Sequence, residues 1–187
     1  MYSKIYENYK KALDANPTSL YASISQNDVN SWCECDRCKQ SKAKYGSDLA
    51  ILIKFVNKVA KQVKIDYPNR ELFVHTFSYH KTSEAITYFD DSIICEDNVS
   101  VMWAPIRANY TTGFKDFSNK SSYEALTALN KICNHISAWT YDSHFPAFFI
   151  TNNTFSGRHE RYETMSENGV DYIFDQSHGN TNQAMSI

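Results

Sequence analysis

Apolar residues recur at helical spacing in several segments of the chain. The clearest segment spans residues 47–66, where one side is apolar and the other carries lysines. Its apolar stripe is Leu49, Leu52, Val56, Val59 and Val63, and Ser47 or Asp48 can cap its start. Three more helices are predicted: one carrying Ile5, Tyr6, Tyr9 and Leu13, one opened by the capping-box pattern Ser121–Glu124 with Leu126, Leu129 and Cys133 on its apolar face, and one over residues 158–167.

Short apolar runs alternate with these helices and predict strands. The runs lie at residues 20–25, 72–77, 99–103, 136–139 and 170–174. Residues 80–98 show no periodic stripe, so we expect irregular structure there. Strands that alternate with helices are typical of βαβ units, which build a parallel sheet. The pattern therefore predicts an α/β fold, with residues 1–187 forming one domain.

Composition and charge narrow the function classes. The chain has 187 residues, 42% of them hydrophobic and 21% charged, which is typical of a globular domain. A net charge of −2 gives no electrostatic basis for binding nucleic acid. No apolar run approaches the roughly 20 residues of a membrane span, and residues 1–7 do not resemble a signal peptide. We expect neither a nucleic-acid nor a membrane partner, and the sequence by itself indicates the cytoplasm.

Aromatic residues make up 14% of the chain, with 13 tyrosines and 11 phenylalanines. Carbohydrate-binding clefts use aromatic rings, because the apolar C–H face of a pyranose stacks on them. Filling of a β-rich core is the alternative explanation for the same composition. Trp139 and Tyr141 lie two residues apart on a predicted strand and so face the same side.

Polar side chains follow each predicted strand. Parallel α/β folds bind ligands at the carboxyl ends of their strands, where these side chains would gather. The strand ends carry Gln26, Asn27 and Asp28, then Tyr79 and His80, then Arg107, then Tyr141 and Asp142, then Asp175 and Gln176. Asp28 and Asp175 each lie at the end of a predicted apolar strand. Two carboxylates across a cleft are the groups that perform glycoside hydrolysis, one as acid and the other as base or nucleophile.

Several motifs together resemble one bacterial family. They are "SISQND", "WCECDRC", "LIKFVNKVAKQVKIDYP", "WAPIRANY", "AWTYDSHF" and "ENGVDYIFDQ", and the resemblance covers residues 20–176. The family is a domain of unknown function regarded as glycoside-hydrolase-like, with a TIM-barrel core distantly similar to α-glucuronidases and β-hexosaminidases. The resemblance implies that this chain forms a partial (β/α)8 barrel of about five strands with outer helices, corresponding to strands four to eight.

The resemblance also bears on two strand ends. Related barrels close the fourth strand with an acidic pair, and Asn27-Asp28 is similar in placement although its first member is an amide. The family's last motif reads Phe-Glu-Gln, whereas this chain has Phe174-Asp175-Gln176. The shorter side chain withdraws the carboxyl group by one methylene, about 1.5 Å.

These observations lead to one expected function and one alternative. We expect a glycoside-hydrolase-like domain acting on an oligosaccharide or polysaccharide; the alternative is a non-catalytic carbohydrate-binding or scaffold remnant of such a barrel. The candidate catalytic residues are Asp28, Asp175 and Asp142, and the candidate substrate-binding residues are Asn27, Tyr79, Arg107, Trp139, Tyr141 and Gln176. A partial barrel leaves strand edges open, so we expect a homo-oligomer or closure by a missing N-terminal half of the barrel.

Three cysteines lie close together, in the order Cys33-x-Cys35-x-x-Cys38. They could hold zinc, could form one disulfide in an exported protein, or could be free structural thiols. A strong zinc signature needs a second matching half, such as another Cys-x-x-Cys, and the chain has none. From the sequence we therefore expect structural thiols, no bound metal and no cofactor, with zinc as the alternative.

Overall fold

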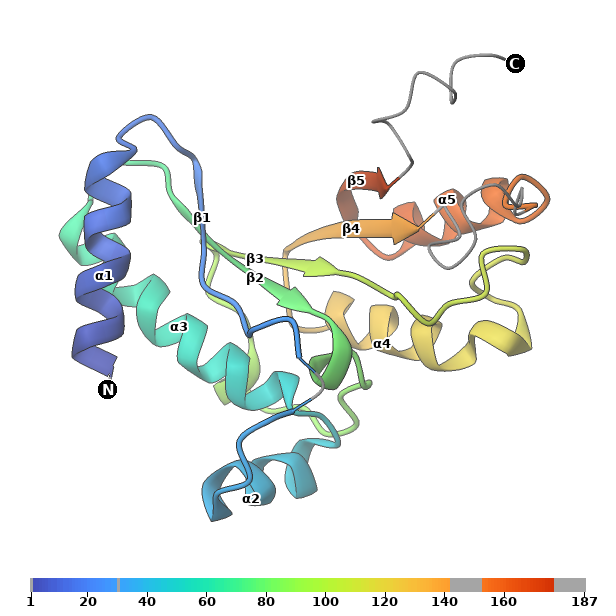
Figure 1. The fold of residues 1–187 in the computed structure, drawn as a ribbon, viewed down its shortest axis with the longest axis horizontal. Coiled ribbons are helices and arrows are strands. Elements are labelled where there is room, and N and C mark those ends of the chain that lie inside the picture. The colour runs from blue at the N-terminus through green and yellow to red at the C-terminus, as the bar shows by residue number, and fades with distance from the viewer. Residues whose placement is uncertain (1, 30, 142–152, 177–187) are drawn as a thin grey trace.

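The computed structural model describes residues 2–29, 31–141 and 153–176. Helices and strands alternate along the chain (Figure 1). The helices are α1 (Tyr2–Ala15), α2 (Asp36–Tyr45), α3 (Leu49–Asp66), α4 (Lys120–Asn130) and α5 (Arg158–Glu167), and the strands are β1 (Tyr21–Ser23), β2 (Phe73–Ser78), β3 (Val99–Trp103), β4 (His135–Tyr141) and β5 (Val170–Gln176). Short 3₁₀ turns η1 (His80–Thr82), η2 (Asp91–Ile93) and η3 (Phe117–Asn119) complete the order.

The five strands form one parallel sheet in the order β1-β2-β3-β4-β5. Each strand therefore pairs with its neighbours in the chain, as successive βαβ units require. The prediction of an α/β fold with a parallel sheet is confirmed. Within the described residues the sheet is not closed, because β1 pairs only with β2 and β5 only with β4.

The core lies between the sheet and its helices. The apolar stripe of α3 is fully buried at Val56 and Val59, and it packs with Val74 of β2 and Val101 of β3 in one continuous cluster. Trp103 closes the same cluster near the end of β3. Each of the helices α1, α3, α4 and α5 contributes buried apolar residues to this cluster. Burial of this apolar area is what stabilises the parallel sheet.

The opposite face of the sheet is less covered. Along β2, Val74, Thr76 and Ser78 are buried, whereas the alternate residues Phe73, His75 and Phe77 are only half-buried. On the edge strands, Tyr21 is 55% exposed and Tyr172 is 61% exposed. Because side chains of a strand alternate between its two faces, this second face carries aromatic residues of β1, β2 and β5.

Two local features differ from the sequence-based prediction. Helix α2 was not predicted, because its buried residues, Cys38, Ser41 and Tyr45, include a serine and form no apolar stripe. Helix α4 begins at Lys120, so Ser121 lies in its first turn and Cys133 follows its end. Residues 80–98 contain only the turns η1 and η2, which confirms that this connection has no α-helix.

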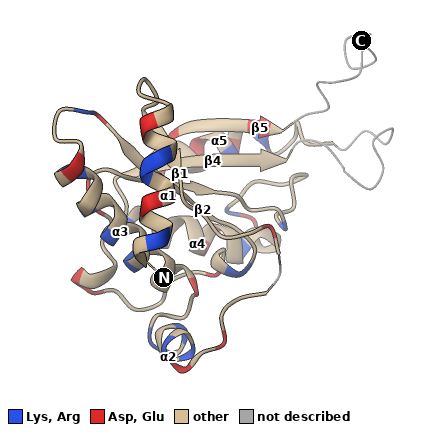
Figure 2. Cartoon of the chain, turned by 60° about the vertical axis from the view of Figure 1, so that its left-hand side comes forward, with Lys and Arg blue, Asp and Glu red and all other residues tan. Residues whose placement is uncertain are grey.

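Charged residues of both signs are interspersed over the helices (Figure 2). Several of them pair across elements, such as Lys10 with Asp66 at 3.1 Å and Lys44 with Asp90 at 2.6 Å. In the part of the chain that the structure describes, no helix is both long enough and apolar enough to cross a bilayer.

Candidate functional site

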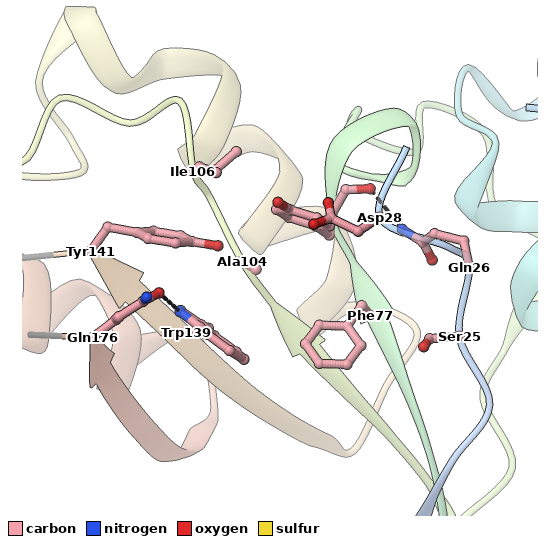
Figure 3. Close-up of a pocket in the computed structure, with 10 residues that line it drawn as sticks. Ser25, Gln26, Asp28, Phe77, Ala104, Ile106, Trp139, Tyr141 and Gln176 are labelled. Atoms are coloured by element: carbon pink, nitrogen blue, oxygen red, sulfur yellow. Dashed lines mark hydrogen bonds between the residues drawn. The ribbon is translucent and has the colours of Figure 1, made fainter. Parts of the chain in front are cut away.

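A cavity of about 440 Å³ opens at the carboxyl ends of the strands. It reaches from the segment after β1 to the end of β5 and so crosses the whole sheet (Figure 3). Its lining residues are Ser25, Gln26, Asp28, Phe77, Tyr79, Ala104, Ile106, Trp139, Tyr141 and Gln176. This is the end of a parallel sheet at which ligands bind, because the loops that follow the strands converge there.

Aromatic rings form the β4–β5 side of the cavity. Trp139 and Tyr141 face the same way, with ring centroids 6.3 Å apart and planes inclined by 28°. The Trp139 Nε1–H donates to Gln176 Oε1 at 2.8 Å (Figure 3). Phe174 packs edge-on against the same indole. These contacts fix the orientation of the indole ring, so the cavity has a preformed flat apolar surface.

Asp28 lies on the other side of the cavity. Its Oδ1 is 3.0 Å from His80 Nε2, and its side chain is 80% exposed. His80 has a φ of 52°, a left-handed conformation that is uncommon for a residue other than glycine. Gln26 Nε2 donates to the Tyr79 carbonyl at 2.8 Å and to Thr82 Oγ1 at 2.9 Å, which ties the segment after β1 to the end of β2.

The charge of Asp28 acts on two tyrosines of the cavity, Tyr79 and Tyr141. Burial raises the pKa of Tyr79, and the charge of Asp28 and the hydrogen bond to it raise this pKa further. Burial also raises the pKa of Tyr141, with smaller contributions from Tyr79 and Asp28. Both phenols therefore stay protonated at neutral pH. The cavity thus offers a carboxylate acceptor and two hydroxyl groups beside an aromatic surface.

The structure does not bring Asp175 together with Asp28. The pleat pairs Thr140 with Asp175 and Tyr141 with Gln176, so Gln176 faces the cavity and Asp175 faces the helices. The Asp175 carboxylate accepts hydrogen bonds from the Thr140 hydroxyl and, at 2.6 Å, from the Tyr162 hydroxyl. Asp142, the third candidate acid, lies outside the described residues.

Two candidate substrate-binding residues do not line this cavity. Asn27 is exposed beside it, and its carbonyl accepts from the backbone N–H of Val29 at 2.8 Å. Arg107 is exposed and borders a second, more polar cavity of about 560 Å³. Sequence reasoning missed Phe77 and Ile106, which do line the first cavity. The alternation along residues 72–77 could have placed Phe77 on the same face as His75.

The three neighbouring cysteines converge in space. The Sγ atoms of Cys33, Cys35 and Cys38 all lie within 4.8 Å of one another, and all three are free thiols. The backbone N–H of Cys38, followed by the two neighbouring thiols, lowers the pKa of Cys35 to about 7. Cys95 and Cys133, also free, are buried elsewhere. The spacing of the three cysteines did not decide whether they meet, and the structure shows that they do.

Comparison with known proteins places the chain in a family. A family model described as "Domain of unknown function (DUF4838)" matches residues 1–186. The chain belongs to this family. No curated protein matches the chain. Because the DUF4838 match covers every residue that lines the cavity, the candidate site lies within the family domain itself.

Proposed function

We propose that this DUF4838 domain is glycoside-hydrolase-like and acts on an oligosaccharide or polysaccharide bound in the cavity at the strand ends. One observation carries the proposal. A single cavity combines an oriented aromatic surface, Trp139 and Tyr141, with the carboxylate of Asp28. An apolar cleft with a few convergent polar groups is the usual form of a small-ligand site.

The lining residues suit a sugar. A pyranose has apolar C–H faces, which the ring surface of Trp139 can stack against, and a rim of hydroxyl groups that need hydrogen-bond partners. The hydroxyls of Tyr79 and Tyr141 can serve those groups as donors or acceptors. The buried side-chain oxygen of Gln26, Oε1, accepts no hydrogen bond from the described residues. A cavity of this volume accommodates one or two sugar rings.

Asp28 is the proposed acid or base. Its exposed carboxylate reaches the cavity and is held by His80, so it can exchange a proton with a bound sugar or with water. Hydrolysis needs a second carboxylate across the scissile bond. Asp142 stays the candidate for that role on the sequence alone, since it lies outside the described residues. The carboxylate of Asp175 is engaged by Thr140 and Tyr162.

The proposal includes the barrel architecture. A parallel sheet with sequential strand order and helices on one face is the arrangement found in a (β/α)8 barrel, and binding at the carboxyl ends is the rule for that fold. With the resemblance noted above, this supports an assignment of the five strands to positions four to eight of a barrel.

A second candidate function is carbohydrate binding without hydrolysis. One observation favours it: Asp28 is the single carboxylate among the described residues that line the cavity. An aromatic cleft could persist in a domain that has lost its acid–base pair, and such a domain would still bind sugar.

One experiment separates these two functions. The protein is applied to a glycan array, and hydrolysis of the bound glycans is then measured. We expect Trp139→Ala to abolish binding, and Asp28→Asn to keep binding but to lower turnover by about 10²-fold or more. Asp171→Asn is the matched control, since Asp171 is an exposed carboxylate near the start of β5, 3.5 Å from His135, and lines no part of the cavity. Binding without any hydrolysis would select the second function, and absence of glycan binding would overturn both.

A further inference from the structure

The three-thiol cluster stands apart from the proposed carbohydrate site. Cys33, Cys35 and Cys38 do not line the cavity. Cys38 is buried in the first turn of α2, Cys35 occupies the N-cap position of this helix, and Cys33 lies two residues earlier, outside any helix or strand. Three separate backbone positions thus direct sulfur atoms at one point. Packing alone does not require such convergence, because two of the three residues are exposed.

The spacing of the sulfur atoms fits a thiophilic cation. A point equidistant from three sulfurs at the 4.8 Å limit lies about 2.8 Å from each, and a Zn–S bond is about 2.3 Å. In tetrahedral coordination the sulfurs lie about 3.8 Å apart, so a movement of about 0.6 Å per sulfur from the 4.8 Å limit is sufficient. The positive end of the α2 dipole lies at the same place and stabilises the thiolate form that binds a metal.

The cluster lies where an irregular segment of backbone joins α2. Residues 24–29 and 31–35 contain no helix or strand, and this segment carries Asp28. At one end Gln26 hydrogen-bonds to Tyr79 and Thr82, and Asp28 meets His80. At the other end Trp32 packs against the core, and the exposed Glu34 lies 4.0 Å from Lys39 of α2. A bond from Cys33 to the first turn of α2 through a shared ion would add a direct link between this end and the helix.

We propose that Cys33, Cys35 and Cys38 bind one Zn²⁺ ion, which fixes the segment between β1 and α2 to the start of α2. The three thiolates occupy three of the four tetrahedral positions of the ion. Among the described residues, no further His, Cys, Asp or Glu joins the cluster, so the fourth position is open to water or to an added ligand. This assignment replaces the expectation of metal-free thiols, because the sequence did not show that the sulfurs meet.

The test is a metal analysis of the full chain, expressed with zinc present and purified without chelators. We expect about one zinc per chain by elemental mass spectrometry, and a loss of this zinc in Cys33→Ser and Cys35→Ser. Both changes are at exposed positions, so the variants should fold, which circular dichroism verifies. Cys133→Ser is the matched control, since it removes a thiol outside the cluster and should leave the zinc content unchanged.

Thermal unfolding provides a second readout. Because the ion binds the folded state, a strong chelator should lower the melting temperature of the wild type and added zinc should restore it. The same chelator should not shift the melting temperature of Cys35→Ser. Wild-type protein with five free thiols and no metal above background would overturn the proposal. So would a disulfide among the three cysteines in intact-mass analysis, or copper(I) in place of zinc.

Discussion

At the scale of single residues, the pleat of the strands decides which candidates reach the site. The shared orientation of Trp139 and Tyr141 was predictable, because residues two apart on a strand face the same side. Asp175 and Gln176 are adjacent, so the pleat allows only one of them to face the cavity. The pairing of Tyr141 with Gln176 selects Gln176. The sequence alone does not give this register, which arises from contacts between distant strands.

His75 provides a pH-dependent prediction. Burial lowers the pKa of His75 below its ordinary value of 6.5, because the charged imidazolium is poorly solvated between Tyr21 and Phe77. Above pH 6.5 both folded and unfolded chains hold a neutral imidazole. As the pH falls below 6.5, the unfolded chain takes up the proton more readily than the folded chain. The free energy of unfolding therefore decreases as the pH falls, until the lowered pKa is passed.

We expect His75→Gln to reduce this dependence on pH. Urea unfolding at several pH values between 7 and 5 measures the free energy of unfolding of wild type and variant. The difference between them should grow as the pH falls. His159→Gln, which changes an exposed histidine in α5, serves as the control and should follow the wild type. Parallel curves for wild type and His75→Gln would contradict the prediction.

At the scale of elements, a strong apolar pattern in the sequence was sufficient to predict a helix or strand. The lack of such a pattern did not mean that an element was absent. The stripe of α3 and the short, mainly apolar run of β3 are visible in the sequence, and the structure has both. Helix α2 has no such stripe, and glycine stops it instead, with Gly46 in a left-handed conformation at φ 80°. Its burial depends on packing against α3, a tertiary contact that local sequence does not encode.

Arg161 shows how one element is fixed to another. This buried arginine of α5 donates to the carbonyl oxygens of Tyr110 at 2.5 Å, Thr112 at 3.0 Å and Thr154 at 2.7 Å. Helix α5 lies so close to this loop that a Cβ on Gly157 would come within 2.3 Å of the Thr112 carbonyl carbon. The arginine therefore replaces water as the partner of backbone groups that the close approach buries.

We expect Arg161→Ala to lower the free energy of unfolding by about 3–5 kcal/mol. The change removes several charge-assisted hydrogen bonds and leaves buried carbonyls without these donors. Urea denaturation followed by tryptophan fluorescence measures the effect. Arg107→Ala, at an exposed arginine, is the control and should change the stability by about 0.5 kcal/mol or less. A loss below about 1 kcal/mol in Arg161→Ala would mean that the loop finds other donors.

At the scale of the whole molecule, one face of the sheet bears on whether the chain associates with itself. Helices cover one face of the sheet. The opposite face, called the inner face below, carries aromatic residues that include Tyr21, Phe73, Tyr172 and Phe174. A cavity of about 340 Å³ between Tyr21 and Tyr172 continues this apolar surface toward the middle of the sheet. In a closed barrel such a face is the interior. Among the described residues the sheet is open, and Tyr21 and Tyr172 on this face are more than half exposed.

This exposed face predicts self-association. The edge strands β1 and β5 each have one neighbour among the described strands, and an open edge beside an apolar surface favours pairing with another chain. In a purified sample the available partner is a second copy, so we expect light scattering to show a mass that rises with protein concentration. Tyr172→Lys places a charge on the inner face and should shift the equilibrium toward the monomer. Phe117→Lys is the matched control, since Phe117 is 87% exposed in η3, outside the sheet, and should leave association unchanged. A monomer at every concentration, or an equal effect of both substitutions, would show that the inner face does not drive association.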